Sequence, residues 1–367
     1  MAKGPRSGLG RATLSDVAAH AGVSTVTASR ALRKPEMVSG DLRARVDRAV
    51  RDLAYVPNQL ASALASAQTR TIGAVVPSLT NGVFADYLRA LHDVFQPAGF
   101  QIVVLNSRYS ADEEEKAIAT LLGQHSQAMI LAGVDQSEGS RRMLHAAAIP
   151  VVQTMELCDD PIDINIGLSQ HDAGYAATRF LLDLGHRRIG YLSARLDARA
   201  QRRTTGYLRA MEEAGIDAAP LLAATPRPSS VAIGAELLSE TLARSPRLEA
   251  VFTCNDDLAL GALFECGRRG IRVPDDLSIV GFNDLEFSAS ANPALTSVAT
   301  PRYAMAERAA EIVLEIVRGS GDRPRELRID MGFSISRRGS TSAAYSRVRR
   351  PAAAARTLPA APRKQAS

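Results

Sequence analysis

Cysteine is scarce in this 367-residue sequence, which has three cysteines, no tryptophan and only 5% aromatic residues. Cys158, Cys254 and Cys266 lack paired C-x-x-C spacing, so we expect buried free thiols and neither a disulfide framework nor a metal site. No stretch approaches the roughly 18 consecutive apolar residues of a membrane-spanning helix, and the N-terminus has no apolar signal-peptide core. These features predict a cytoplasmic protein with no membrane partner.

Common catalytic motifs are also missing. The sequence contains no G-x-S-x-G, no H-E-x-x-H and no Walker loop, and its six histidines are scattered. We therefore expect neither enzyme activity nor a cofactor.

Basic charge is concentrated at the two ends of the chain. The net charge is only +5, but residues 1–65 hold ten Lys and Arg against five Asp and Glu, and residues 341–367 hold six against none. The body between them is acidic, an asymmetry typical of a chain whose end meets nucleic acid or another anionic surface. The tail, rich in Ala, Pro, Arg and Ser, is expected to be disordered.

Residues 13–54 have the pattern of three short helices. Thr13 and Asp16 have the spacing of a capping box, Ser24 can cap a second helix after a glycine turn, and a third helical pattern begins at Ser39. Three helices with a tight turn before the second indicate a helix-turn-helix, whose second helix enters the DNA major groove. A generic small helical bundle is the alternative.

The outer face of the second helix favours DNA contact. It carries short hydroxyl or methyl side chains and Arg30, with no acid to repel phosphate. Arg30 can donate two hydrogen bonds to a guanine edge, and Thr25 and Val26 can contact bases or a thymine methyl group. Further basic residues suit phosphate contacts or a solvated surface: Arg33, Lys34, Arg43, Arg45 and Arg48.

From Thr71 onward, short apolar runs alternate with helical patterns. The runs are TIGAVVPSL, QIVVLNS, AMILAG, PVVQTM, RIGYLS, AVFTCN and LSIVGFN. This alternation predicts parallel sheets covered by helices, and about 270 residues suffice for two doubly wound subdomains. Ligands of such sheets bind beyond the carboxyl ends of the strands.

The runs TLSDVAAHAGVSTVTASRAL, VSGDLRARVDRAVRDLAYVPNQLASAL and TRTIGAVVPSLTNGVFADYLRAL resemble the lactose-repressor and galactose-repressor (LacI) family of bacterial transcription regulators. The resemblance covers about residues 12–340 and includes GHRRIGYL, CNDDLALG, VPDDLSIVGFND and PALTSV. It implies an all-α helix-turn-helix domain and an α/β periplasmic-binding-protein-like body. The expected divisions are a disordered leader (1–12), a DNA-binding domain (13–57), a hinge helix and linker (58–70), an effector-binding and dimerisation domain (71–340, with subdomains 71–169 plus 298–325 and 170–297 plus 326–340) and the tail (341–367).

The resemblance also assigns residues to the DNA interface. The hinge segment would become a helix on operator DNA, where Leu64 would wedge into the minor groove. The residues expected to contact DNA are Thr13, Ser24, Thr25, Val26, Thr27, Ser29, Arg30, Tyr55, Asn58 and Leu64.

A second implied site is an effector pocket between the subdomains. Arg199 lies at a position similar to the family's effector-binding arginine, and its guanidinium suits a carboxylate or phosphate. Asn283 replaces an Asp that grips hydroxyl groups in many sugar-responsive relatives, and Ser169-Gln170 replaces a common Asp-Asn, which puts that contact in doubt. We expect Asp256 to organise the pocket wall. The expected effector residues are Asn81, Phe84, Arg108, Arg199, Asp256 and Asn283.

Together these features predict a homodimeric repressor of near-palindromic double-stranded operator DNA, controlled by a small-molecule effector. Several segments, ARLDAR among them, are more similar to the gluconate-operon repressor branch than to the purine or lactose branches, which implies a sugar acid such as gluconate. Two alternatives remain: a family regulator that responds to a neutral sugar or acts with a co-repressor, and a solute-binding protein without a DNA role.

Overall fold

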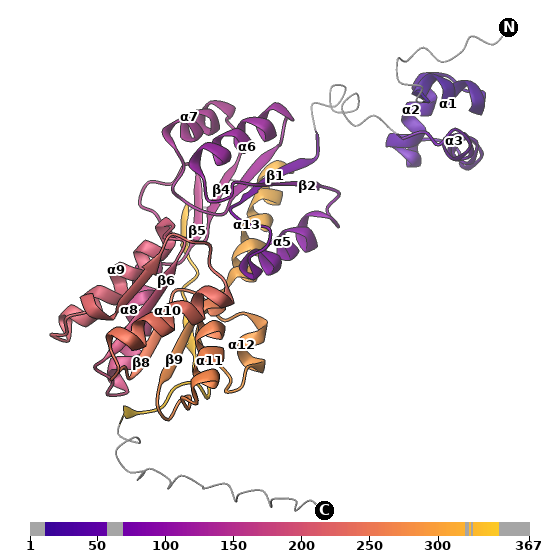
Figure 1. Cartoon of the computed structure of the whole chain (residues 1–367). Coiled ribbons are helices and arrows are strands. Elements are labelled where there is room, and N and C mark those ends of the chain that lie inside the picture. Colours follow the sequence, from indigo (N-terminus) through magenta and orange to yellow (C-terminus); the bar gives the residue numbers. More distant parts are fainter. Residues whose placement is uncertain (1–11, 57–68, 320–322, 324–325, 345–367) are drawn as a thin grey trace, which may run out of the picture. The chain divides into compact units, whose positions relative to one another are not determined.

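The computed structural model describes residues 12–56, 69–319, 323 and 326–344. Backbone contacts divide the chain into two units, Met1–Thr69 and Arg70–Ser367 (Figure 1). Asn58 and Leu64, both expected at the DNA interface, lie outside the described residues. No described helix combines the length and the apolar composition needed to cross a bilayer.

Within the N-terminal unit, the described residues 12–56 form three helices and one short 3-10 turn, which confirms the three helices expected there from the sequence. The elements are α1 (Leu14–Ala21), α2 (Thr25–Arg33), the 3-10 turn η1 (Pro35–Met37) and α3 (Gly40–Asp52). Gly22 ends α1 with a φ of 65°, a left-handed conformation that costs glycine little. Small apolar side chains form its core: Val17, Ala21, Ala31, Val46 and Ala49.

The first subdomain of the larger unit is built on a sheet ordered β11-β5-β4-β3-β1-β2, in which all strand pairs are parallel. Its strands are β1 (Thr71–Val76), β2 (Gln101–Asn106), β3 (Ala128–Leu131), β4 (Val151–Thr154), β5 (Ile164–Gly167) and β11 (Arg328–Asp330). Its helices are α5 (Gly82–Phe95), α6 (Ala111–Gly123), α7 (Glu138–Ala147) and α13 (Arg302–Val317).

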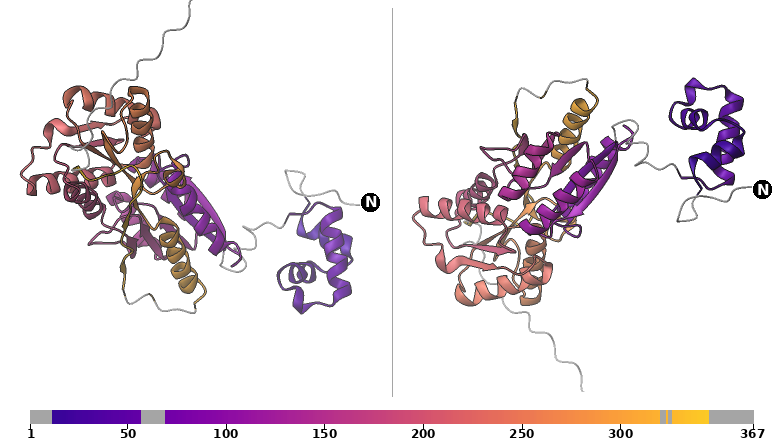
Figure 2. Two further views of the ribbon diagram at one scale, coloured as in Figure 1. Left: turned by 90° about the horizontal axis from the view of Figure 1, so that it is seen from below. Right: turned by 90° about the horizontal axis from the view of Figure 1, so that it is seen from above.

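Side chains of β1 alternate between two cores, as the period of a strand requires. Ile72, Ala74 and Val76 join the core that includes residues of α5 and α13, whereas Val75 joins the core formed with α6 and α7. The sheet is therefore covered on both faces, as Figures 1 and 2 show.

The second subdomain repeats this plan with the strand order β12-β10-β9-β8-β6-β7. Its strands are β6 (Ile189–Ala194), β7 (Leu222–Thr225), β8 (Ala250–Thr253), β9 (Ser278–Asn283), β10 (Thr296–Ala299) and the antiparallel β12 (Ser334–Ser336). The remaining elements are α8 (Gln170–Asp183), α9 (Ala198–Glu213), η2 (Ala219–Leu221), α10 (Val231–Arg244), α11 (Asp256–Arg269) and α12 (Glu286–Ser290). The predicted α/β body of two doubly wound sheets is confirmed.

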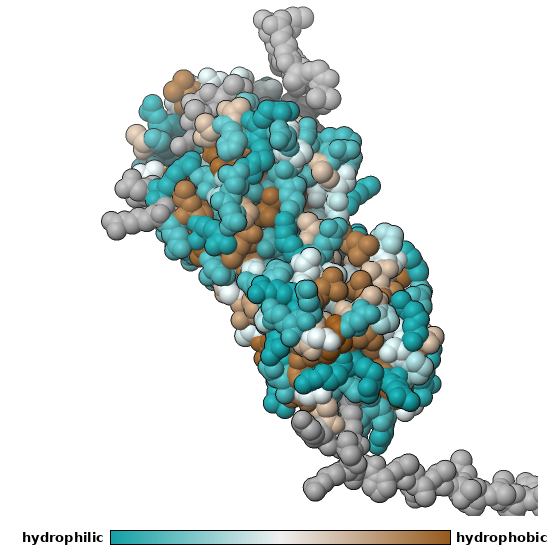
Figure 3. Space-filling view, turned by 90° about the vertical axis from the view of Figure 1, so that its left-hand side faces the viewer, coloured by the Kyte–Doolittle hydropathy of each residue, from teal (hydrophilic) through white to brown (hydrophobic). Residues whose placement is uncertain are grey.

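Polar side chains cover most of the molecular face shown in Figure 3, and apolar residues interrupt them in separate patches. Such scattered apolar residues are ordinary for a folded protein surface. The large apolar side chains of the strands lie inside, among them Ile72, Tyr191, Phe252 and Phe282.

Two boundaries expected from the sequence need correction. The expected second subdomain includes all of 326–340, but β11 pairs with the free edge of β5 in the first sheet. The expected tail begins at residue 341, but Thr341 is buried and its hydroxyl lies 2.9 Å from that of Thr296. Ser342 also lies 2.9 Å, through its carbonyl oxygen, from Nε2 of His186. Both errors concern short segments whose partners are distant in the sequence.

The described chain passes three times between the subdomains: from β5 to α8, from β10 to α13, and from β11 to β12. The carboxyl ends of the parallel strands of both sheets are followed by loops that meet at one cleft, which holds the candidate effector site.

Candidate functional site

The helix α2 presents a small polar face in the N-terminal unit. Ser24 caps it by accepting a hydrogen bond from the Thr27 amide at 3.1 Å, and the two hydroxyl groups lie 2.8 Å apart. Ala28 and Ala31 face the core, whereas Thr25, Val26 and Arg30 are exposed. Val26 is 65% exposed, which is high for an apolar residue. Short exposed side chains and one exposed guanidinium are groups that can form contacts with base edges.

Three cations, Arg30, Arg33 and Lys34, lie in the last turn of α2 or cap its end. No acid lies in α2, and the ion pairs of the described N-terminal unit are His20–Asp52 and Arg43–Asp47. Arg30, Arg33 and Lys34 therefore carry charges that no described carboxylate neutralises. Such free cations at one face supply the electrostatic part of DNA affinity.

Three residues of this unit have local structural roles. Arg45, expected at phosphate or in solvent, is exposed and also donates hydrogen bonds to the Ala21 and Gly22 carbonyl oxygens at 2.5 and 3.1 Å, at the end of α1. Thr13 accepts a hydrogen bond from the Asp16 amide, and its own amide binds the Asp16 carboxylate at 2.8 Å. Tyr55 packs against the core of the unit.

A cavity lies in the cleft between the subdomains, and four expected effector residues line it: Asn81, Phe84, Arg199 and Asn283. Asn81 caps α5 by accepting a hydrogen bond from the Val83 amide at 3.1 Å, and its side-chain nitrogen lies 3.5 Å from the Tyr109 hydroxyl. Phe84 is buried, and the Arg199 guanidinium lies 5.7 Å from the centre of its ring.

Arg199 is partly neutralised inside this cavity. Asp197 caps α9 and lies 3.7 Å from Nε of Arg199. Burial alone would raise the pKa of Asp197, but Arg199, Arg203 and two backbone amides outweigh it, so the net shift is downward. The carboxylate is thus held in its charged form beside the guanidinium.

Arg203 is the main residue that the sequence reasoning missed. It lies one helical turn after Arg199, lines the same cavity and is only 8% exposed. Its Nη1 donates to Oε1 of Gln170 at 2.8 Å, and its guanidinium lies 4.4 Å from the centre of the Phe282 ring. Its Nε has no hydrogen-bond partner among the described residues. The i, i+4 spacing from Arg199 is the signal that could have found it.

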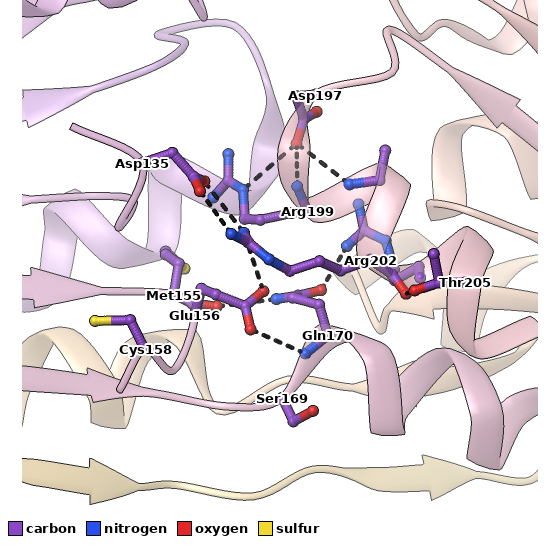
Figure 4. A network of polar contacts seen from close by, with 12 residues as sticks. Asp135, Met155, Glu156, Cys158, Ser169, Gln170, Asp197, Arg199, Arg202 and Thr205 are labelled. Atoms are coloured by element: carbon purple, nitrogen blue, oxygen red, sulfur yellow. Dashed lines mark hydrogen bonds and ion pairs between the residues drawn. The ribbon is translucent and has the colours of Figure 1, made fainter. Parts of the chain in front are cut away.

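Gln170, at the start of α8, aligns Arg203 with the first subdomain. Besides accepting from Arg203, it donates through Nε2 to the Met155 carbonyl oxygen at 2.9 Å, and its amide donates to Oε1 of Glu156 at 3.4 Å (Figure 4). Burial raises the pKa of Glu156 to about 7, although Arg202 opposes the shift. The position where the sequence departs from the common Asp-Asn therefore supports an arginine.

Asn283 lies at the opposite wall of the cavity. It is only 8% exposed and its φ is 105°, a strained value for a side-chain-bearing residue. Arg302 holds it by donating to its carbonyl oxygen at 2.6 Å while pairing with Asp86 at 2.6 Å. The side-chain amide of Asn283 forms no hydrogen bond with the described residues, so its NH2 group can donate to a ligand and its oxygen can accept from one.

Two expected effector residues do not line this cavity. Arg108 is exposed beside it, and the next residue, Tyr109, lines the cavity under the guanidinium of Arg195 at 4.1 Å. Asp256 is fully buried behind the wall, where it accepts hydrogen bonds from the Leu285 amide at 2.7 Å and the Ser297 hydroxyl at 2.6 Å. Burial raises the pKa of Asp256 to about 7.

The described cysteines are free thiols, and the described residues form no candidate metal site. Cys254 and Cys266 are buried as expected, whereas Cys158 is only half-buried. Across the described residues, no group of three His, Cys, Asp or Glu side chains is placed to hold a metal ion.

Comparison with known proteins gives separate matches for the N-terminal unit and for the larger unit. Residues 13–58 match the model of bacterial regulatory proteins of the lacI family, and residues 178–341 match a periplasmic binding protein-like domain. The HTH-type transcriptional regulator GntR of Pseudomonas aeruginosa is 45% identical over 90% of this chain and 96% of its own. A LacI-family regulator from Silicibacter pomeroyi aligns with a TM-score of 0.85 at 33% identity, covering 90% of this chain and 99% of its own.

A structure of the lac repressor dimer bound to operator and an anti-inducer is also similar, with a TM-score of 0.76 at 26% identity over 91% of this chain and all of its own. Identity, coverage and fold agree along the length of the chain. The chain therefore belongs to the lacI family of bacterial regulatory proteins, as a DNA-binding transcriptional repressor with a helix-turn-helix unit and a periplasmic-binding-like body.

Proposed function

We propose that a sugar acid such as gluconate binds in the cleft and controls the affinity of this repressor for its operator. The observation that carries the proposal is Arg203, a buried guanidinium in the cavity lining whose Nε has no described partner. A buried cation in this state favours an anionic ligand, because a carboxylate would supply the missing charge and hydrogen bonds.

The other cavity residues suit the polyol part of such a ligand. Asn81 and Asn283 carry neutral amides, which can both donate to and accept from hydroxyl groups. Arg199 adds a second guanidinium whose charge Asp197 already offsets in part. The similarity to regulators named GntR supports the same ligand class.

On DNA, we propose a homodimer that reads a near-palindromic operator with two α2 helices, because a two-fold protein matches a two-fold site. The lac repressor structure, a dimer on its operator, supports this assembly. Thr25, Val26, Thr27, Ser29 and Arg30 would face the bases. Leu64 of each hinge segment would wedge into the minor groove. A repressor of chromosomal DNA would act in the cytoplasm.

Effector binding would stabilise the closed form of the cleft, change the spacing of the two hinge segments and release the operator. The expected hinge is too short to persist as a helix without DNA, since isolated helices need about 12–15 residues to be even marginally stable. Closure of the body would therefore lower operator affinity.

Calorimetric titration of the full chain with gluconate, 6-phosphogluconate, a neutral hexose and a purine tests the ligand class. Fluorescence anisotropy on the protein's own promoter region tests the regulation. We expect a sugar acid to bind and to weaken the DNA complex. Binding of only the hexose or the purine would refute the sugar-acid assignment, and a sugar acid that tightens the DNA complex would reverse the proposed sign.

A further inference from the structure

A charge cluster bridges the two subdomains beside the effector cavity without lining it. Arg202 of α9, in the second subdomain, binds Asp135 with both terminal nitrogens, at 2.5 and 3.1 Å. Asp135 lies between β3 and α7 of the first subdomain. The Arg202 Nη1 also lies 3.8 Å from Oε2 of Glu156, which follows β4 in the first subdomain. Figure 4 shows Arg202 between the two carboxylates.

Both sides of this cluster are held rigidly. On the first-subdomain side, the Glu156 carbonyl oxygen accepts a hydrogen bond from Asn165 at 2.8 Å, and Gly167 has no room for a side chain beside the Glu156 backbone. On the other side, α9 packs against α8, with the Arg203 backbone close against Gly174. The Arg202 contacts therefore depend on how the two subdomains are placed relative to each other.

The Glu156 carboxyl group is buried beside this cation. It is only 3% exposed, and its Oε2 has no hydrogen-bond partner among the described residues. Arg202 is the cation nearest to that oxygen among the described ion pairs. Opening of the cleft would break the contacts of Arg202 with Asp135 and with Glu156 together, so these contacts favour the closed form.

We propose that Arg202 is a positioning residue that stabilises the closed cleft and so sets effector affinity without contacting the effector. Its contacts with Asp135 and Glu156 are called the latch below. This inference rests on the proposed function for the link to effector affinity, but the latch itself does not. The binding-competent closed form is populated less without the latch, and apparent affinity falls in proportion to that population.

Charge reversal and exchange test the latch. The variants are Arg202→Asp, Asp135→Arg and the double exchange D135R/R202D. The matched control is Arg209→Asp, on the same helix α9, which removes an ion pair with Glu213 at 3.0 Å that stays within the second subdomain. Unfolding midpoints of all variants verify folding.

Two readouts separate the latch from the ligand assignment. The first readout is the distance between two spin labels and needs no effector. The labels are attached at Glu138→Cys in α7 and Glu212→Cys in α9. The chain also carries Cys158→Ser, and labelled chain is diluted with unlabelled chain. We expect R202D to add a longer-distance population and R209D to leave the distribution unchanged. We expect the exchange to restore the distribution in part, because its new carboxylate at position 202 still lies beside Glu156. The second readout is calorimetric gluconate affinity, which we expect to fall at least about fivefold in R202D and to recover in part in the exchange.

Different results would contradict the latch and the proposed function. An R202D distance distribution equal to that of the unsubstituted chain, or an exchange that restores neither readout, would overturn the latch. If no sugar acid binds the unsubstituted chain, the proposed function fails, and the label distances alone decide whether Arg202 holds the cleft closed.

Discussion

Gly206 of α9 lies directly against the backbone of His171 in α8. A Cβ on Gly206 would sit 2.7 Å from the Tyr175 nitrogen and closer still to the His171 carbonyl oxygen. Real side chains do not tolerate such approaches, so the two helices cross at a distance that only glycine permits. This crossing fixes the position from which Arg199, Arg202 and Arg203 extend.

The first prediction concerns this crossing. Gly206→Ala should destabilise the body by about 1–3 kcal/mol, because the helices must separate, and should weaken gluconate binding by displacing the arginines. Gly267→Ala in α11 is the matched control, since no atom lies within 4 Å of the place that a Cβ would take there. Denaturant unfolding should show the control unchanged or stabilised by about 1 kcal/mol. Equal stability of the two variants would contradict the close crossing.

Arg203 should dominate the binding of the ligand's negative group. Arg203→Ala should reduce gluconate affinity by at least about 30-fold, because it leaves a buried carboxylate unpaired. Arg203→Lys keeps the charge but loses the planar fork, and should give an intermediate loss. Calorimetry measures both, with thermal unfolding as the folding control. An Ala variant that binds gluconate normally would remove Arg203 from the ligand site.

The stability of the body should depend on pH through Asp256. Burial raises the pKa of this carboxyl in the folded chain to about 7, so the folded state keeps a proton that the unfolded state releases from about pH 4 upward. The free energy of unfolding should therefore fall by a few kcal/mol as pH rises from about 4 to about 7. The buried Glu156 acts in the same direction.

Asp256→Asn should remove part of this slope, since the amide is neutral at every pH and still accepts a hydrogen bond from Leu285 or Ser297. Urea unfolding at pH 5, 6, 7 and 8 measures the slope. The matched control is Glu138→Gln, whose side chain is 93% exposed, and it should keep the slope of the unsubstituted chain. An unchanged slope in the Asn variant would show that Asp256 titrates normally.

Arg30→Ala should relax base preference at one operator position, with a loss of about 1–3 kcal/mol there. Lys34→Ala is the comparison, because a phosphate contact should weaken binding to all sequences equally and lower the salt dependence. Anisotropy titrations on an operator and its single-base variants separate the two patterns. A uniform loss for Arg30→Ala would assign it to the phosphate backbone.

Leu64→Ala should weaken operator binding strongly, because an apolar side chain wedged into the minor groove stabilises bent DNA. Gluconate affinity should stay unchanged, because Leu64 belongs to the hinge segment and not to the described residues that line the cavity. Paired anisotropy and calorimetric titrations measure both affinities. A parallel loss of both would indicate a structural defect rather than a lost DNA contact.

Local features were predictable from the sequence because they depend on neighbours in the chain. The caps at Thr13 and Ser24, the three short helices and the long apolar strands all matched the structure. The edge strands β7, β11 and β12 were not predicted, because each is short and becomes a strand only by pairing with the edge of a sheet.

Sequence by itself determined the family, the order of elements and the placement of Asn81, Arg199 and Asn283 near the carboxyl ends of strands, although Arg199 lies in the first turn of α9 and Asn283 ends β9 rather than lying in a loop. Only the tertiary structure decided which polar groups share the cavity: Arg203 is buried there, Arg108 is exposed, and Asp256 is enclosed behind the wall. The physical reason is that burial and charge compensation arise from packing between elements far apart in the chain. The contact of α8 with α9 and the three crossings between the sheets provide that packing.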